Sequence, residues 1–360
     1  MRRLFFLFLS LFLFSCAPTP QLAPTRLFAP AATLAPPRTD APGRVSTPLP
    51  SPTRTPALTP SATLIPSATP TFTPTPIPPK VVIISIDGLR PDALMQADAP
   101  NVKALVKRGS YTWKAQTIFP PVTLPAHASM LSGHPPEAHG ITWNDYQPAR
   151  GAITVTTIFS LTHTTGLRTV MVVGKEKFAH LDTPGSVDTY LFATRGDQDV
   201  ADQAIAQIQS GFDLMFVHFP NNDYFGHLYG WMSKTQIAQL ARTDEAVGRL
   251  LAALPENTTV ILTADHGGHG LLHGANIPVD MTIPWIVAGP GILQDHELTS
   301  PVNVMDTAAT AAYVFGLSLP PDTEGKPVYE AFGQSAPTAP RAGAVEDFRG
   351  VRPNKRQPPR

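Results

Sequence analysis

One stretch of the chain reads Asn257-Thr-Thr-Val-Ile-Leu-Thr-Ala-Asp-His-Gly-Gly-His-Gly-Leu-Leu-His273. Its first seven residues are mostly β-branched or apolar, a pattern typical of a buried strand. The pair Asp265-His266 follows at the strand's carboxyl end, where open α/β sheets place their ligand sites. The glycines that come next allow a tight turn, so His273 can return to the same point. Carboxylate and imidazole together favour zinc or a similar metal, and the alternative is a Gly/His-rich surface loop.

Buried strands and helices alternate through the middle of the chain. Apolar runs at 81–87, 169–174, 212–217 and 283–288 predict further strands, and helical patterns cover 99–108, 200–209 and 234–254. Strands that are apolar on both faces, separated by helices, predict a mainly parallel sheet with helices on both faces. Residues 80–333 are about the length of one such α/β domain.

Three of the predicted strands end in residues that can bind a metal. Asp87 closes the first strand, Asp223 and His227 follow the strand at 212–217, and the Asp265-His266 pair follows the strand of the opening stretch. A lone Asp after a strand usually caps a turn or a helix. The carboxyl ends of parallel strands, however, meet at one sheet edge. Together with His273 these residues make six candidate ligands, enough for two metal ions.

A hydroxyl that can attack phosphorus lies in the segment Phe119-Pro-Pro-Val-Thr-Leu-Pro-Ala-His-Ala-Ser-Met-Leu-Ser-Gly133. Pro125 can begin a helix, which places Thr123 near the helix N-terminus. Free N–H groups there favour an anion such as a phosphoryl group. A bound metal can deprotonate the threonine and make it a nucleophile. The alternative role for Thr123 is that of an N-capping residue.

The two ends of the chain have a different composition. Met1-Arg2-Arg3 precedes an apolar run from Leu4 to Phe14 that is too short to span a bilayer, and Leu13-Phe14-Ser15-Cys16 resembles the lipobox of bacterial lipoproteins. The resemblance implies a signal peptide at 1–16, lipid attachment at Cys16, and an extracytoplasmic location at the membrane or cell surface. The alternative is an ordinary secretory signal. Residues 17–79 and 334–360 are rich in proline and are predicted to be a disordered tether and tail.

The overall composition excludes several classes of protein. Lys and Arg total 27 and Asp and Glu total 27, so charge gives no reason to expect nucleic acid as a partner. The chain has a single cysteine, which excludes an internal disulfide framework and a Cys-based zinc cluster. The sequence predicts no oligomeric state.

In combination, these segments resemble the type I phosphodiesterase/nucleotide pyrophosphatase family of the alkaline phosphatase superfamily. The resemblance covers residues 80 to about 332 and implies an alkaline-phosphatase-like α/β core. The motifs that carry it are Ile86-Asp-Gly88, the Thr123 segment, Gly133-His-Pro-Pro-Glu-Ala-His-Gly-Ile-Thr-Trp-Asn144, Asp223-Tyr-Phe-Gly-His227, Ala264-Asp-His-Gly267 and His273-Gly-Ala-Asn-Ile-Pro-Val-Asp-Met-Thr-Ile-Pro284.

The resemblance assigns a role to each site residue. One zinc ion is implied at Asp223, His227 and His273. A second is implied at Asp87, Asp265 and His266, with the Thr123 hydroxyl beside it. Asn144 matches an amide that donates to a phosphoryl oxygen. The implied reaction is hydrolysis of a phosphodiester or pyrophosphate bond, in nucleotides or related esters, through a phosphothreonine intermediate. His127, His139 and His269 match no ligand position.

Other functions are weighed against this one. A sulfatase is disfavoured because the Thr123 segment lacks the Cys/Ser-x-Pro-x-Arg motif. The related phosphoglycerate and phosphopentomutases are cytosolic, whereas this chain has an export signal. A phosphomonoesterase is the nearest alternative, and the absence of an arginine near Thr123 favours diesters over monoesters. A non-catalytic surface binding protein would be expected to have lost a ligand or the nucleophile, yet all seven positions are filled.

Overall fold

The computed structural model describes residues 78–336. The predicted signal peptide with Cys16 lies outside the described residues, as do nearly all of the predicted tether and most of the predicted tail. The described residues include every predicted strand and every predicted site residue other than Cys16.

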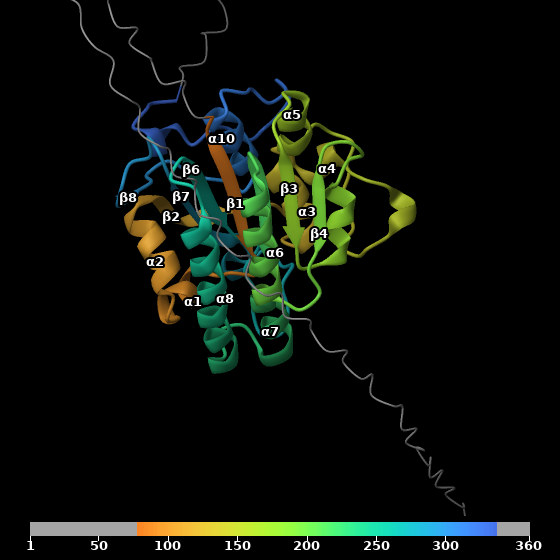
Figure 1. Ribbon diagram of the computed structural model, residues 1–360. Helices are drawn as coiled ribbons and strands as arrows, with labels where there is room; N and C mark the ends of the chain where they lie inside the picture. The colour runs from red at the N-terminus through yellow and green to blue at the C-terminus, as the bar shows by residue number, and fades with distance from the viewer. Residues whose placement is uncertain (1–77, 337–360) are drawn as a thin grey trace, which may run out of the picture. The chain divides into compact units, whose positions relative to one another are not determined.

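A central sheet organises this part, and its strands run in the order β4-β3-β5-β1-β6-β7-β2-β8 (Figure 1). Its strands are β1 (Lys80–Ile86), β2 (Gly109–Gln116), β3 (Thr169–Val173), β4 (Thr189–Phe192), β5 (Leu214–Phe219), β6 (Thr258–Thr263), β7 (Thr282–Ala288) and β8 (His296–Glu297). Strand β1 lies between β5 and β6 and pairs with both in parallel. Residues 81–86 of β1 are all buried, because helices cover both faces of the sheet.

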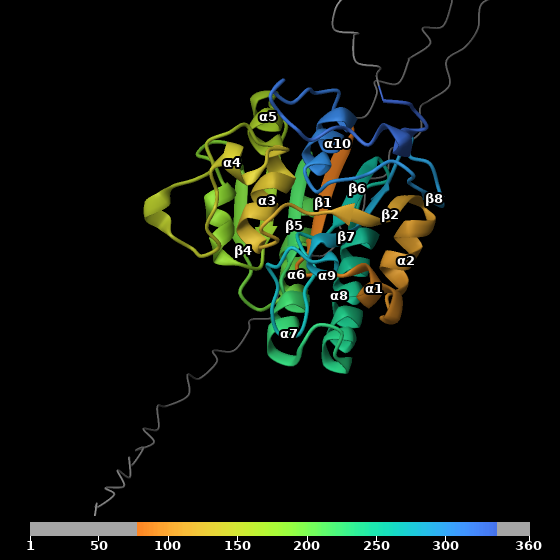
Figure 2. The ribbon, with the colours of Figure 1, turned by 180° about the vertical axis from the view of Figure 1, so that it is seen from behind.

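Helices lie on the two faces as predicted (Figures 1 and 2). One face carries α1 (Pro91–Gln96), α2 (Pro100–Lys107), α6 (Asp197–Ser210) and α8 (Lys234–Ala253), with α7 (Asn221–Tyr229) at its lower end. The other carries α3 (Thr123–Ser132), α4 (Pro136–His139), α5 (Ile158–Thr164) and α10 (Asp306–Val314). The prediction of a mainly parallel α/β fold is therefore confirmed.

Strand β7 departs from the predicted parallel arrangement, because it pairs antiparallel with both β6 and β2. Residues 264–281 connect β6 to β7 through the glycine-rich loop and the single turn α9 (Pro278–Met281). This connection contains no helix long enough to carry the chain back across the sheet. The next strand therefore starts at the edge where β6 ended, and it runs in the opposite direction.

Helix α3 is enclosed more completely than an ordinary surface helix, since all ten of its residues are buried. It begins at Thr123, as predicted, and ends at Gly133, whose φ of +74° is easily adopted only by glycine.

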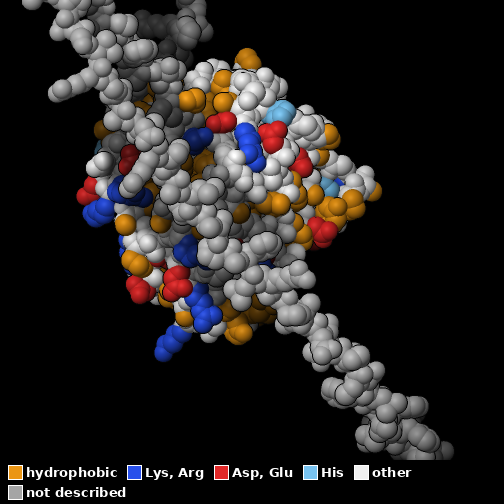
Figure 3. All heavy atoms as spheres, in the orientation of Figure 1, with side chains coloured by type: hydrophobic (Ala, Val, Ile, Leu, Met, Phe, Trp, Pro, Cys, Tyr) orange, Lys and Arg blue, Asp and Glu red, His pale blue; other side chains and the backbone are white. Residues whose placement is uncertain are grey.

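On the face shown in Figure 3, basic and acidic side chains are interspersed. Within residues 78–336, no helix is both long enough and apolar enough to cross a bilayer.

Candidate active site

The six predicted metal ligands lie at the carboxyl edge of three neighbouring strands. Asp87 follows β1, and the Asp265-His266 pair follows β6. Strand β5 leads into α7, where Asp223 and His227 are one helical turn apart and so lie on the same side of the helix. The loop that returns from β6 toward β7 carries His273. Because β5, β1 and β6 are adjacent, these segments converge although they are up to 186 residues apart in the chain (from Asp87 to His273).

Each of the three carboxylates has one oxygen held by hydrogen-bond donors. Asp87 Oδ2 accepts from Lys175 Nζ at 2.6 Å and from His218 Nε2 at 2.8 Å. Asp223 Oδ2 accepts from Lys175 at 2.7 Å, and Asp265 Oδ1 accepts a backbone N–H at 3.0 Å. Within the described residues, the other oxygen of each carboxylate is buried and has no hydrogen-bond partner. Three unpartnered buried oxygens in one place fit a bound cation.

The three histidines are oriented in a matching way. In each, Nδ1 lies against a backbone carbonyl oxygen, at 2.7 Å for His266 and at 2.9 Å for His273 and His227. A carbonyl can only accept a hydrogen bond, so Nδ1 carries the proton and Nε2 keeps its lone pair. This is the outer-shell arrangement that orients metal-binding histidines.

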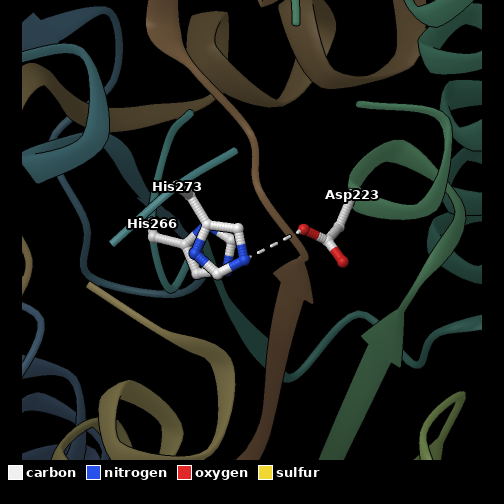
Figure 4. Close-up of side chains that lie close together, drawn as sticks. All are labelled: Asp223, His266 and His273. Atoms are coloured by element: carbon white, nitrogen blue, oxygen red, sulfur yellow. Dashed lines mark ion pairs between the residues drawn. The ribbon is translucent and has the colours of Figure 1, made fainter. Parts of the chain in front are cut away.

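The free atoms form two compact trios that share one histidine. Ligand atoms lie within 4.8 Å of one another in the trio Asp87, Asp265 and His266, and likewise in the trio Asp223, His266 and His273. His266 Nε2 is 3.2 Å from Asp265 Oδ2, and His273 Nε2 is 3.7 Å from Asp223 Oδ1 (Figure 4). His227 Nε2 lies 3.4 Å from Asp223 Oδ1, beside the second trio. All six predicted ligands therefore converge, and their donor set fits divalent metal ions.

Burial and charge set the protonation of these groups. Burial, reinforced by the negative charge of Asp87, raises the pKa of Asp265 well above its usual value. Burial would raise the pKa of Asp87 too, but Lys175 and His218 hold it well below the usual range. Burial lowers the pKa of His266, and it lowers that of His273 to about 4. Both imidazoles are therefore neutral at pH 7, the form that binds metals.

Thr123 is the first residue of α3 and is 1% exposed. The N-cap position belongs to Val122, and the Thr123 hydroxyl instead faces Lys175, with 3.3 Å between Oγ1 and Nζ. The alternative role of Thr123 as an N-capping residue is therefore wrong. The helix N-terminus also offers fewer donors than we expected. The Leu124 N–H is taken by Asn144 Oδ1 at 2.9 Å, and Pro125 has no N–H.

Asn144 is held by two hydrogen-bond donors on its amide oxygen. That oxygen accepts from the Leu124 N–H and from Lys177 Nζ, the latter at 3.1 Å. The amide nitrogen is then the end available to an outside acceptor beside Thr123. This is the orientation needed to donate a hydrogen bond to a phosphoryl oxygen.

Two lysines at the site were not predicted from the sequence. Lys175 and Lys177 lie in Gly174-Lys-Glu-Lys177, directly after β3 and so at the same sheet edge as the ligands. Charged residues at the end of a buried parallel strand were the signal that could have found them. Burial alone would lower the pKa of Lys175, but Asp87 and Asp223 raise it, and the ammonium is fully charged. Lys177 has no carboxylate within 4.0 Å among the residues described.

Trp231 is a further residue that the sequence did not single out. It packs against three glycines, each next to or between predicted ligands: Gly88, Gly226 and Gly268. A Cβ atom added at these positions would lie 3.2, 2.7 and 2.2 Å from the indole ring. The indole N–H also donates to Gly88 O at 3.0 Å. Three ligand-bearing segments therefore close around one buried side chain.

The remaining histidines near the site have partners of their own. His127 Nδ1 donates to Thr123 O at 2.7 Å and Nε2 lies 2.8 Å from Ser85 Oγ. His139 contacts Ser129 Oγ at 3.0 Å, and His269 contacts Asp280 at 2.8 Å. None of the three belongs to either trio.

Comparison of the sequence with known proteins identifies one family. The sequence profile of the family described as type I phosphodiesterase / nucleotide pyrophosphatase matches residues 81–278. The human GPI ethanolamine phosphate transferase 2 catalytic subunit is 26% identical over 279 residues, covering 71% of this chain and 28% of the relative. The bovine bis(5'-adenosyl)-triphosphatase ENPP4 is 25% identical over 215 residues, covering 53% and 48%. The chain thus spans at most about half of these relatives.

Solved structures show the same fold. Murine ectonucleotide pyrophosphatase/phosphodiesterase 5, an inactive variant in complex with AMP, superposes with a TM-score of 0.60 at 15% identity, covering 70% of this chain and 98% of the other. The 2-O glycosaminoglycan sulfatase BT1596 gives a TM-score of 0.59 at 16% identity, covering 73% and 76%. At these identities the likeness concerns the fold alone.

The packing around Trp231 predicts that Gly268→Ala displaces the loop between β6 and β7 that carries His266 and His273, since the new Cβ would overlap the indole. We expect metal affinity to fall about 10- to 100-fold, the usual cost of disturbing an outer-shell contact. Metal titration monitored by calorimetry measures this. The matched control is Gly270→Asn in the same loop, where φ is +51° and no atom lies within 4 Å of an added Cβ. Equal affinities for the two variants would contradict the prediction.

Proposed function

Because this chain belongs to the type I phosphodiesterase / nucleotide pyrophosphatase family, we propose that it hydrolyses phosphodiester or pyrophosphate bonds with Thr123 as the nucleophile. One observation carries the proposal. The buried Thr123 hydroxyl, freed from any capping role, lies beside Lys175, which also contacts two of the predicted metal-binding carboxylates. A hydroxyl in such a setting is suited to covalent catalysis.

We further propose two divalent metal ions, zinc in preference to others, at the predicted ligands. Asp223, His227 and His273 would hold one ion, and Asp87, Asp265 and His266 the other. When bound, such ions supply positive charge that favours the alkoxide form of Thr123 and neutralises charge on the leaving oxygen. The mixed nitrogen and oxygen donors, with neutral imidazoles, support this choice of metal.

The chain's own residues would carry the reaction through two displacements. In the first, Thr123 Oγ1 bonds to phosphorus, the bond to the leaving oxygen breaks, and the threonine proton ends on the leaving alcohol or phosphate. In the second, water attacks phosphorus, the bond to Oγ1 breaks, and Thr123 regains a proton. Lys175 steadies the Thr123 oxygen, while Asn144 and Lys177 face the charge that develops on the phosphoryl oxygens.

Nucleotides are the substrate class that the relatives suggest. One relative is named a bis(5'-adenosyl)-triphosphatase, and one solved neighbour holds AMP. The proposed location is outside the cytoplasm, at the membrane or cell surface, with a lipid on Cys16. The observation that favours the phosphomonoesterase alternative is Lys177, which could pair with the second negative charge of a monoester. A purely binding role is disfavoured because the nucleophile and all six ligands converge.

Replacing the nucleophile tests the mechanism. We expect Thr123→Ala to bind metal normally, because the six protein ligands remain, but to lower kcat by about a thousandfold or more. Thr123→Ser keeps the hydroxyl and should retain substantial activity. Metal content, melting temperature and kcat are measured together. Acid-quenched wild type should carry a phosphoryl group on the peptide that contains Thr123. Turnover of Thr123→Ala near the wild-type rate would falsify the covalent route.

The substrate class is tested with a matched pair of chromogenic esters. We expect kcat/KM to be higher for bis(p-nitrophenyl) phosphate than for p-nitrophenyl phosphate. Lys177→Met should lower the monoester value more than the diester value, because only the monoester has a second negative charge for Lys177 to contact. The exposed Lys114→Met serves as the control. A wild-type enzyme faster on the monoester would support the phosphomonoesterase instead.

The predicted anchor is tested at Cys16. We expect the mature wild-type chain to begin at this cysteine, to carry acyl chains and to sediment with membranes. Cys16→Ser should remove the lipid and impair signal cleavage. Mass spectrometry of the N-terminal peptide gives the answer, and an unmodified soluble chain that begins elsewhere would rule out the lipoprotein assignment.

A further inference from the structure

Large apolar side chains are exposed beside the site on α7 and on the loop that follows β6. They are Tyr224, Leu228, Tyr229, Leu271 and Leu272, exposed by 58%, 51%, 53%, 53% and 63%. We call this group the apolar rim. Exposed apolar residues scattered singly need no explanation, but a cluster of five large ones beside a candidate active site does.

The rim is continuous with the metal ligands. Tyr224 follows Asp223 and Leu228 follows His227 in α7, whereas Leu272 precedes His273 in the loop. Helix and loop are joined, because His227 Nδ1 donates to Leu271 O at 2.9 Å and the backbone N–H of Trp231 donates to Gly270 O at 2.7 Å. Whatever covers the rim therefore also lies beside the predicted ligands His227 and His273.

The shape and charge of the rim indicate the kind of partner. The rim consists of part of a helix and part of a loop, and α7 lies at the lower end of the described residues, where Figure 3 shows hydrophobic side chains beside Lys and Arg side chains. Residues 224–235 and 270–279 contain one charged residue, the basic Lys234. A protruding surface of leucines and tyrosines without acidic groups suits the interface of a bilayer with anionic or zwitterionic head groups. Small ligands, in contrast, are bound in concave pockets.

We propose that the apolar rim rests on a lipid bilayer and that the substrate is the phosphodiester or pyrophosphate head group of a lipid in that bilayer. This inference rests on the proposed function, whose lipid anchor at Cys16 would hold the domain next to a membrane. Contact at the rim would then turn the ligand edge of the sheet toward the head groups.

The contact is tested with a tryptophan reporter in the full-length protein. Leu272→Trp places the indole in the rim. The control Leu293→Trp places it at the opposite edge of the sheet, after the antiparallel β7, at a residue that is 38% exposed. Both variants are mixed with phosphatidylcholine vesicles that carry brominated acyl chains. We expect the fractional quenching of fluorescence for Leu272→Trp to exceed that of the control by at least about twofold. Equal quenching, or none at residue 272, would overturn the inference.

A second measurement separates this inference from the proposed function. Leu228→Ser combined with Leu272→Ser should lower the ratio of turnover on vesicle-borne phospholipid to turnover on soluble bis(p-nitrophenyl) phosphate by about tenfold. An unchanged ratio would overturn the inference while leaving the hydrolase intact. Failure of the wild type on both substrates would overturn the proposed function instead. A dimer that dissociates in the double variant, without quenching in vesicles, would assign the rim to a second copy of the chain and overturn the lipid contact.

Discussion

Three buried carboxylates repel one another at one end of the sheet, and the rest of the site must hold them together against this repulsion. Asp87, Asp223 and Asp265 are each at most 4% exposed, so water cannot screen their charges. Lys175 offsets part of this repulsion by contacting two of them, and a bound cation at the unpartnered oxygens would offset more. Burying like charges this closely is unfavourable for stability alone, which makes the arrangement typical of a functional site. The parallel strands, the helix α7 and the glycine-rich loop all serve to hold it.

Much of the fold and of the candidate site could be predicted, because most of the ligands directly follow an apolar run in the sequence. An apolar run that ends in Asp or His marks both a buried strand and its functional edge, so Asp87, Asp265 and His266 were evident. The rest depends on contacts between distant segments. Lys175 meets residues 48 and 88 positions away, and Trp231 meets a glycine 143 positions away. The direction of β7 is set by the short connection that precedes it. An apolar run predicts that a strand is present, but it does not predict the direction of that strand.

The comparisons and the geometry support the function at different levels. The family is shown by a profile that spans most of the described core, and the fold is shared with both nucleotide phosphodiesterases and sulfatases. Since one fold hosts both chemistries, the distinction rests on the nucleophile and its surroundings. A threonine with a neighbouring lysine, and an asparagine whose amide oxygen is held by Leu124 and Lys177, favour phosphoryl transfer. The match covers 28% and 48% of the two curated relatives, so their substrates come to this chain only as proposals.

Thr123, the proposed nucleophile, and His273, a proposed metal ligand, lie in parts of the structure that are buried to different degrees. Thr123 starts helix α3, whose ten residues are all buried. The amide protons of this helix can therefore exchange with solvent only when much of the domain unfolds. His273 lies on a loop fastened by a few hydrogen bonds, in which neighbouring Leu271 and Leu272 are more than half exposed. Local opening at the exposed end of that loop would cost less free energy than unfolding α3. A metal ion bound at His273 could then enter or leave through such an opening, with Thr123 held in place in α3.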